Sequence, residues 1–169
     1  MPDYNFTLFD TALFTNSVPS PFVLFQVAES GDATHTPYFT NMRGNGQLPN
    51  SEKFLIQSIE VYSDTDFVEN DREGVWLKSY MRLLYNDVQI FSAPLRLAAG
   101  HAAFSGVGNY AAAAANPSFG LMGTGYKLEK PILIDGGKQF KVVVAQGTAL
   151  NSADQWVKVA LNGILSLSA

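Results

Sequence analysis

Residues 126–145 read YKLEKPILIDGGKQFKVVVA, and the spacing of their apolar side chains predicts the fold class of the chain. Two runs of apolar residues share one parity, which is the period of a β-strand with one buried face: Tyr126, Leu128, Ile132 and Ile134, and then Phe140, Val142 and Val144. Asp135, Gly136 and Gly137 separate the two runs and are residue types that tight turns prefer. We therefore expect a β-hairpin built from strands near 126–134 and 139–145.

The same alternation recurs along the rest of the chain. Val157, Val159 and Leu161 alternate with polar residues and predict a final strand. Residues 75–85 also alternate; a helix is the second interpretation of this run, but the Asn86-Asp87 pair that follows favours a hairpin into the next strand. In all we expect about eight strands, near 21–28, 37–41, 53–63, 75–85, 88–97, 126–134, 139–145 and 156–167.

Antiparallel strands without alternating helices predict an all-β domain of two packed sheets. We expect a single jelly-roll β-sandwich, and an eight-stranded Greek-key sandwich of another topology is the alternative. Residues 20–169 are assigned to this one domain. Residues 1–19 mix Phe6, Leu8 and Phe9 with polar residues and include Pro19, which predicts an N-terminal arm that docks on another surface rather than a full sandwich strand.

Residues 97–126 are the most unusual part of the sequence. No Asp, Glu, Lys or Arg occurs between Arg96 and Lys127, and the stretch is rich in Ala and Gly, including Ala111 to Ala115. We expect a long loop here, and loops of this kind are uncommon in compact domains unless they are functional or disordered. Since Ala and Gly allow close backbone approach and bring no charge to desolvate, we interpret residues 97–126 as a contact element rather than a catalytic lid.

Charged residues are scarce. They make up 15% of the 169 residues, against about 25% in typical soluble domains, while apolar residues make up 47%. We therefore expect partner molecules to cover much of the surface. The first Lys or Arg is Arg43, so residues 1–42 carry four acidic residues and no basic one. Proteins that bind nucleic acid use clustered Lys and Arg to displace counterions, so we expect no direct nucleic-acid partner.

No motif in the sequence predicts catalysis or a cofactor. Gly106 to Ala111 match the dinucleotide-binding pattern G-x-G-x-x-G/A, but a short alanine run before Pro117 replaces the long helix that such a site needs. The chain has no cysteine, and neither His35 nor His101 has a second histidine nearby in sequence, as clustered metal sites require. We predict no catalytic residue, no metal ligand and no cofactor, and therefore not an enzyme.

One acidic cluster leaves a metal site open as an alternative. An EF-hand loop fails here because Val68 and Glu69 stand where an oxygen ligand and a glycine are needed. We favour a solvated loop, with a looser Ca²⁺ site as the alternative. The cluster consists of Asp64, Asp66, Glu69, Asp71 and Glu73.

The two tryptophans also allow two interpretations. Trp76 and Trp156 both fall in predicted strands opposite apolar positions. This placement favours burial at the edge of the sandwich or at a subunit contact. The alternative is a sugar-stacking platform, because flat aromatic faces bind the apolar faces of sugar rings.

The segment LEKPILIDGGKQFKVVV, from Leu128 to Val144, carries a resemblance to a known family. Its Pro-Ile-x-Ile strand, glycine turn and Phe-x-Val strand, followed by the run from Trp156 to Leu167, resemble the closing strands of single jelly-roll major capsid proteins. The family is that of tailless, icosahedral bacteriophages with an internal membrane. The resemblance covers residues 53–64 and 126–167, and in length the chain is similar to the smaller of the two major capsid proteins of the thermophilic phages of this type.

This resemblance implies upright jelly rolls joined into pseudo-hexameric capsomers over a lipid bilayer, which separates the shell from double-stranded DNA. It implies three contacts: other copies of the chain, a second capsid protein and the internal viral membrane. The expected location is the capsid of a virion. A carbohydrate-binding lectin-like module and a trimeric ligand of the tumour-necrosis or complement type are the alternative functions.

Overall fold

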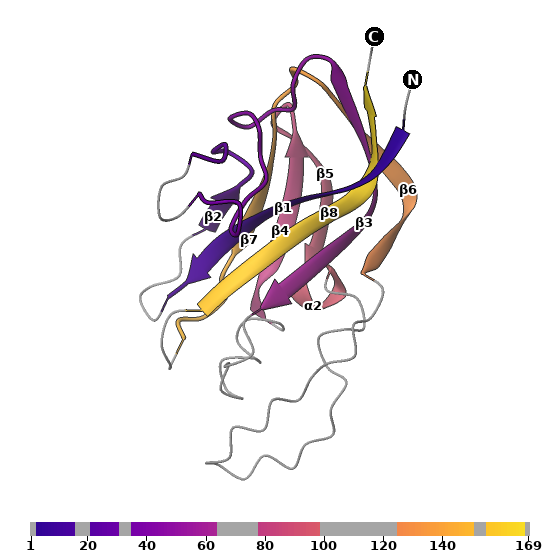
Figure 1. Cartoon of the computed structure of the whole chain (residues 1–169). Helices are drawn as coiled ribbons and strands as arrows, with labels where there is room; N and C mark the ends of the chain where they lie inside the picture. Colours follow the sequence, from indigo (N-terminus) through magenta and orange to yellow (C-terminus); the bar gives the residue numbers. More distant parts are fainter. Residues whose placement is uncertain are drawn as a thin grey trace.

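The computed structural model describes residues 3–15, 21–30, 35–63, 78–98, 125–150 and 155–167. Within these ranges the chain forms eight strands and one short helix, arranged as two layers (Figure 1). The elements are β1 (Asp3–Phe14), β2 (Pro21–Leu24), β3 (Glu52–Ser63), β4 (Tyr80–Tyr85), β5 (Val88–Pro94), α2 (Leu95–Ala98), β6 (Tyr126–Asp135), β7 (Phe140–Ala145) and β8 (Gln155–Leu167).

The strands make two sheets of four, with orders β1-β8-β3-β6 and β2-β7-β4-β5. Every neighbouring pair is antiparallel. Figure 1 shows β1 and β8 side by side across the front layer, with β4, β5 and β7 behind them. The prediction of an all-β sandwich of two antiparallel sheets is confirmed.

The core lies between the two sheets and follows the predicted alternation. β7 alternates buried and half-buried residues along its whole length, with Val142 and Val144 fully buried. Aromatic side chains from both layers meet in the core: the rings of Phe14 and Phe22 stack 5.2 Å apart, and those of Phe25 and Phe140 lie 5.8 Å apart. Burying large apolar side chains of this kind supplies most of the free energy that holds a sandwich together.

The prediction that residues 1–19 form an arm instead of a full strand is wrong for Asp3–Phe14, which are β1 and pair with β8 along their full length. Leu8, Ala12 and Phe14 point into the core, at even positions of the strand. Asp10 shares this inward parity and breaks the apolar pattern in the sequence. Hydrogen bonds to its carboxylate stabilise Asp10 in this buried position, and no pattern in the sequence indicates them.

The prediction of a hairpin in residues 126–145 is half correct. The two strands exist, as β6 and β7, but they belong to different sheets: β6 pairs with β3, and β7 pairs with β2 and β4. The turn after Asp135 therefore carries the chain across the core. Gly137 has a φ of 69° in this turn and donates its N–H to the carbonyl oxygen of Leu48, a neighbour from a distant part of the chain.

Three predicted strand ranges are also wrong in part. Residues 37–41 form a turn, because the N–H groups of Phe39 and Thr40 both donate to the carbonyl oxygen of Thr36. The strand predicted for 21–28 ends at Leu24, since the next residue has a φ of 65°. The strand predicted for 88–97 ends at Pro94, and α2 follows because Leu95 and Ala98, three positions apart, are both buried.

The long predicted strand 75–85 is described only in part. Residues 80–85 form β4, with Met81 and Leu83 buried and Tyr80 and Arg82 exposed, while residues 78 and 79 lie outside the strand. Residues 75–77 are outside the described ranges. Of the predicted loop 97–126, residues 99–124 are likewise outside them, Leu97 belongs to α2 and Tyr126 begins β6.

A pair of substitutions in β1 tests its place in the sandwich. Leu8→Ala should lower the free energy of unfolding by about 2–5 kcal/mol, because Leu8 is 2% exposed and its removal leaves a cavity in the core. Asn5→Ala on the exposed face should change it by about 0.5 kcal/mol or less. Urea unfolding measures both values, and equal small effects would mean that β1 is a dispensable arm.

Candidate functional site

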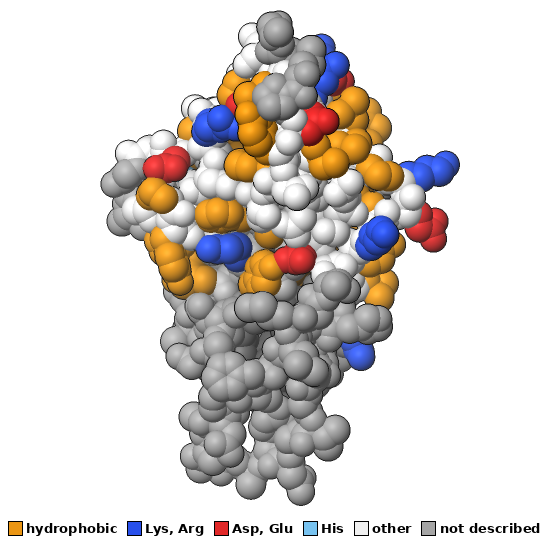
Figure 2. Space-filling model, turned by 45° about the vertical axis from the view of Figure 1, so that its right-hand side comes forward, with side chains coloured by type: hydrophobic (Ala, Val, Ile, Leu, Met, Phe, Trp, Pro, Cys, Tyr) orange, Lys and Arg blue, Asp and Glu red, His pale blue; other side chains and the backbone are white. Residues whose placement is uncertain are grey.

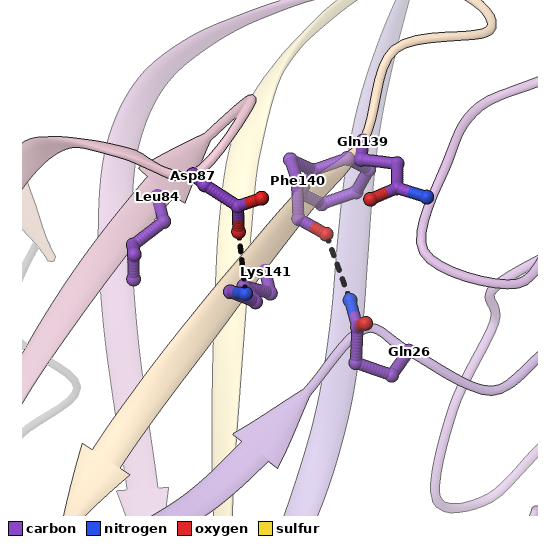
Figure 3. A pocket seen from close by; sticks show the side chains of 6 residues that line it. All are labelled: Gln26, Leu84, Asp87, Gln139, Phe140 and Lys141. Carbon is purple, nitrogen blue, oxygen red and sulfur yellow. Dashed lines mark hydrogen bonds and ion pairs between the residues drawn. The ribbon is translucent and has the colours of Figure 1, made fainter.

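A hollow between the ends of β4 and β7 is too small for a ligand pocket. Its cavity volume is about 10 Å³, whereas small-molecule sites usually hold about 300–1,000 Å³. Its polar groups also bind one another (Figure 3): Lys141 Nζ lies 2.7 Å from a carboxylate oxygen of Asp87, and Gln26 Nε2 donates to the carbonyl oxygen of Phe140 at 3.0 Å. The lining residues are Gln26, Leu84, Asp87, Gln139, Phe140 and Lys141.

Most of the residues singled out from the sequence fall outside the described ranges. These are the acidic cluster within 64–73, the segment 106–111, His101 and Trp76. In the part of the chain that the structure describes, no three His, Asp or Glu side chains are placed to hold a metal ion. His35 and Trp156 lie within the described ranges. His35 acts on the buried carboxylate of Asp10, and Trp156 packs against Phe39.

Trp156 belongs to a surface group that we call the Trp156 cluster, made of Phe9, Tyr38, Phe39, Trp156 and Lys158. The rings of Phe39 and Trp156 lie 4.5 Å apart, and Tyr38 meets Phe39 edge to face at 5.1 Å. Lys158 Nζ lies 4.6 Å from the ring centre of Phe9 and 4.8 Å from that of Tyr38, within cation–π range. Lys158 Nζ also donates to the carbonyl oxygen of Tyr38 at 2.7 Å.

The strands place this cluster on the outer face of the β1-β8 layer. In β8, Val157 and Val159 are buried in the core, so Trp156 and Lys158, which have the opposite parity, point outward. The turn at 36–40 then lays Tyr38 and Phe39 over them. Trp156 is half-buried, while Tyr38 is 72% exposed. Part of the cluster therefore packs locally, and one aromatic face stays open to solvent.

The segment 39–41 is held against β1 by hydrogen bonds along the strand edge. The N–H of Phe9 donates to Asn41 Oδ1 at 2.8 Å, and Asn41 Nδ2 donates to the carbonyl oxygen of Thr7 at 2.7 Å. Thr11 Oγ1 donates to the carbonyl oxygen of Phe39 at 2.7 Å. Through these bonds an irregular segment covers the β1 edge of the β1-β8-β3-β6 sheet.

Asp10 is a buried carboxylate that the sequence patterns did not single out. It is 8% exposed and accepts hydrogen bonds from the N–H of Phe25 at 2.5 Å and from that of Thr11 at 2.9 Å. Burial raises the pKa of Asp10 above its ordinary value of 3.8, against the opposing effects of these bonds, the Thr40 hydroxyl and the charge of His35. The carboxylate thus links β1 of one sheet to the end of β2 in the other.

The outer surface of the described residues has few charges. Figure 2 shows hydrophobic side chains standing between isolated charged groups and uncharged surface. Large apolar side chains are well exposed in several elements, with Val88 at 63% in β5 and Leu97 at 56% in α2. Among the described residues, no helix is long and apolar enough to cross a membrane.

No protein-family model, curated protein or solved structure matches the chain in the comparisons. The fold and the surface chemistry of the described residues are therefore the basis for a functional assignment.

The substitution Asp10→Asn tests the buried carboxylate. We expect it to lower the free energy of unfolding by about 1–3 kcal/mol, because the single amide oxygen cannot accept from both Thr11 and Phe25. The folded chain holds the Asp10 proton to higher pH than the unfolded chain, so the stability this group gives is full below pH 3.8 and is lost as pH rises through the raised pKa.

The advantage of the wild type over Asp10→Asn should therefore shrink as pH rises from 3.8 through the raised pKa. Urea titrations of both proteins at a series of pH values measure this difference. An advantage that grows with pH would mean that hydrogen bonds to the ionised carboxylate outweigh its desolvation.

A second pair of substitutions measures how much Trp156 contributes to packing. Trp156→Ala should lower the free energy of unfolding by about 1–3 kcal/mol, because the ring is half-buried against Phe39. A fully buried tryptophan would give roughly 3–5 kcal/mol. Tyr62→Ala, at an aromatic side chain that is 45% exposed, is the control, and its effect should stay within about 0.5 kcal/mol.

Proposed function

We propose that the sandwich is a single jelly roll. The pairing of the strands supports this: β1 pairs with β8, β2 with β7, β3 with β6 and β4 with β5. A long antiparallel hairpin with its turn between β4 and β5 has this set of pairs. When it rolls up so that successive pairs enter alternate sheets, β8 meets β3 and β7 meets β4, as they do here.

We propose that the protein is a major capsid protein whose copies assemble into the capsomers of an icosahedral virion. The strand order carries this proposal, because viral shells are a principal use of the jelly roll. Since one fold serves several functions, the surface must also agree. Only 15% of residues are charged, and exposed apolar side chains such as Val88 and Leu97 gain free energy when a neighbouring subunit covers them.

The resemblance to capsid proteins of internal-membrane bacteriophages supplies the proposed partners. They are further copies of the chain, a second capsid protein and the internal viral membrane. Direct contact with nucleic acid is not part of the proposal, because residues 1–42 lack Lys and Arg. The proposal assigns the chain no catalytic residue, metal or cofactor.

The assembly state of the purified protein tests this function. We expect oligomers in analytical ultracentrifugation, and closed shells or sheets in electron micrographs either of the protein alone or after a second shell protein from the same particle is added. Point-group assembly of this kind requires extended contacts between copies. A species that stays monomeric at high concentration, with no co-assembling protein in its source particle, would contradict the proposal.

Carbohydrate binding is the second candidate, and the Trp156 cluster is the observation that favours it. Tyr38 presents a 72% exposed ring beside Lys158, and an exposed aromatic face next to a polar group suits the apolar and hydroxyl faces of a sugar. Loss of glycan-array binding in Tyr38→Ala, with binding kept in Tyr4→Ala at a second exposed tyrosine and both proteins melting normally, would support a lectin. Absence of binding by the wild type would remove this candidate.

A further inference from the structure

The edges of the two sheets differ in how they are protected. Each four-stranded sheet ends in two edge strands, which are β1 and β6 in one sheet and β2 and β5 in the other. An edge strand presents unpaired N–H and C=O groups, which can pair with a strand of another molecule. Proteins avoid unwanted pairing with short strands, charged residues, proline or a covering segment.

Three of the four edges carry such protection. The β1 edge is covered by the segment 39–41. The β6 edge contains Lys127, Glu129 and Lys130 followed by Pro131, which has no N–H to donate. The β2 edge is four residues long and begins with a proline.

The β5 edge has none of these before its last residue, Pro94, and its one protective feature up to that point is a β-bulge at Ile90. Its seven residues, VQIFSAP from Val88 to Pro94, include no charged side chain. β4 pairs with one side of the strand, and within the described ranges no strand pairs with the other side. Val88 is 63% exposed and Ile90 is 38% exposed. A single bulge lies at Ile90, and Phe91 to Pro94 run in regular register with β4 beyond it.

β5 is also held in place before any partner arrives. Asn86 and Asp87 have φ values of 48° and 62°, which suits the two-residue turns that match the twist of a hairpin. Asp87 is tied to Lys141 of β7 by the ion pair at 2.7 Å. At the other end, the N–H of Leu95 donates to the carbonyl oxygen of Ser79. A preformed edge loses little conformational freedom on pairing, which favours association.

We propose that the side of β5 that faces away from β4 pairs antiparallel with β5 of a second copy of this chain. A twofold axis places the same strand on both sides of the contact, and two identical strands related by it run antiparallel. Since Val88–Pro94 carry no charge, self-pairing brings no like charges together, which would oppose it. Pairing covers Val88 and Ile90 and joins two four-stranded sheets into one.

This inference deepens the proposed function, since it names one contact through which copies of the shell protein associate. It does not require closed shells. A dimer through β5 without shells would support the contact and count against the capsid function. Shells that persist after β5 is altered would support the capsid function and count against the contact.

Charged variants of β5 test the contact with the full chain. Two double variants are made, Ile90→Lys with Ser92→Lys and Ile90→Glu with Ser92→Glu, because both positions are exposed. Each variant alone should associate about tenfold more weakly than the wild type or worse, since like charges face one another across the twofold axis. An equimolar mixture of the two should restore association, because opposite charges then meet. Sedimentation equilibrium measures all three.

Val23→Lys on the β2 edge of the same sheet is the matched control, at a side chain that is 50% exposed. It should associate like the wild type, and all variants should melt cooperatively. Those backbone amides of residues 88–93 that point away from β4 should gain protection from hydrogen exchange as wild-type concentration rises. Unchanged association of both double variants would overturn the proposal. It would also be overturned if Val23→Lys lost association and the mixture of the two double variants did not regain it.

Discussion

The antiparallel ladder between β1 and β8 is the contact on which the rest of the sandwich depends. It pairs Asp3 with Ser166 and Phe14 with Gln155, so strands from the two ends of the described chain lie together over twelve residues. β8 pairs with β3 on its other side and so joins β1 to the remainder of its sheet. The ladder presents one row of apolar side chains to the core and leaves the other face for the Trp156 cluster. The pairing register of β1 and β8 thus decides which of their side chains enter the core and which lie on the outer face.

One polar contact inside the core also links the two sheets. The carboxylate of Asp10 reaches from β1 to the N–H of Phe25, directly after β2 ends. A buried backbone N–H without a partner costs about as much as a lost hydrogen bond, so this acceptor allows the chain to leave β2 at a positive φ. The free energy spent on desolvating the carboxylate is only partly offset by the bonds it accepts, so its pKa is raised. Residues 39–41 in turn lie along the free side of β1, where they hydrogen-bond to Thr7, Phe9 and Thr11.

The surface of the described residues exposes apolar side chains in several elements. Its hollow is small and its polar groups bind one another, whereas its apolar side chains are spread over several elements. The edges of the sheets are unequal, and β5 is the edge whose sequence contains neither charge nor an internal proline. In an assembling protein, such differences between edges decide which surfaces meet and in what symmetry.

The sequence alone determined the fold class and most strand positions, because period-two alternation is a local property that a buried face imposes on every strand. It predicted β3, β6, β7 and β8 to within a residue at most ends. The tertiary structure decided which strands pair: the glycine turn after Asp135 crosses between sheets, since the partner of β6 is β3 rather than its neighbour in sequence. It also decided that β1 is a strand, because the buried carboxylate of Asp10 is stabilised by a hydrogen bond from the N–H of Phe25, which lies in another part of the chain. The Trp156 cluster likewise joins residues far apart in the chain, so no local pattern could assemble it.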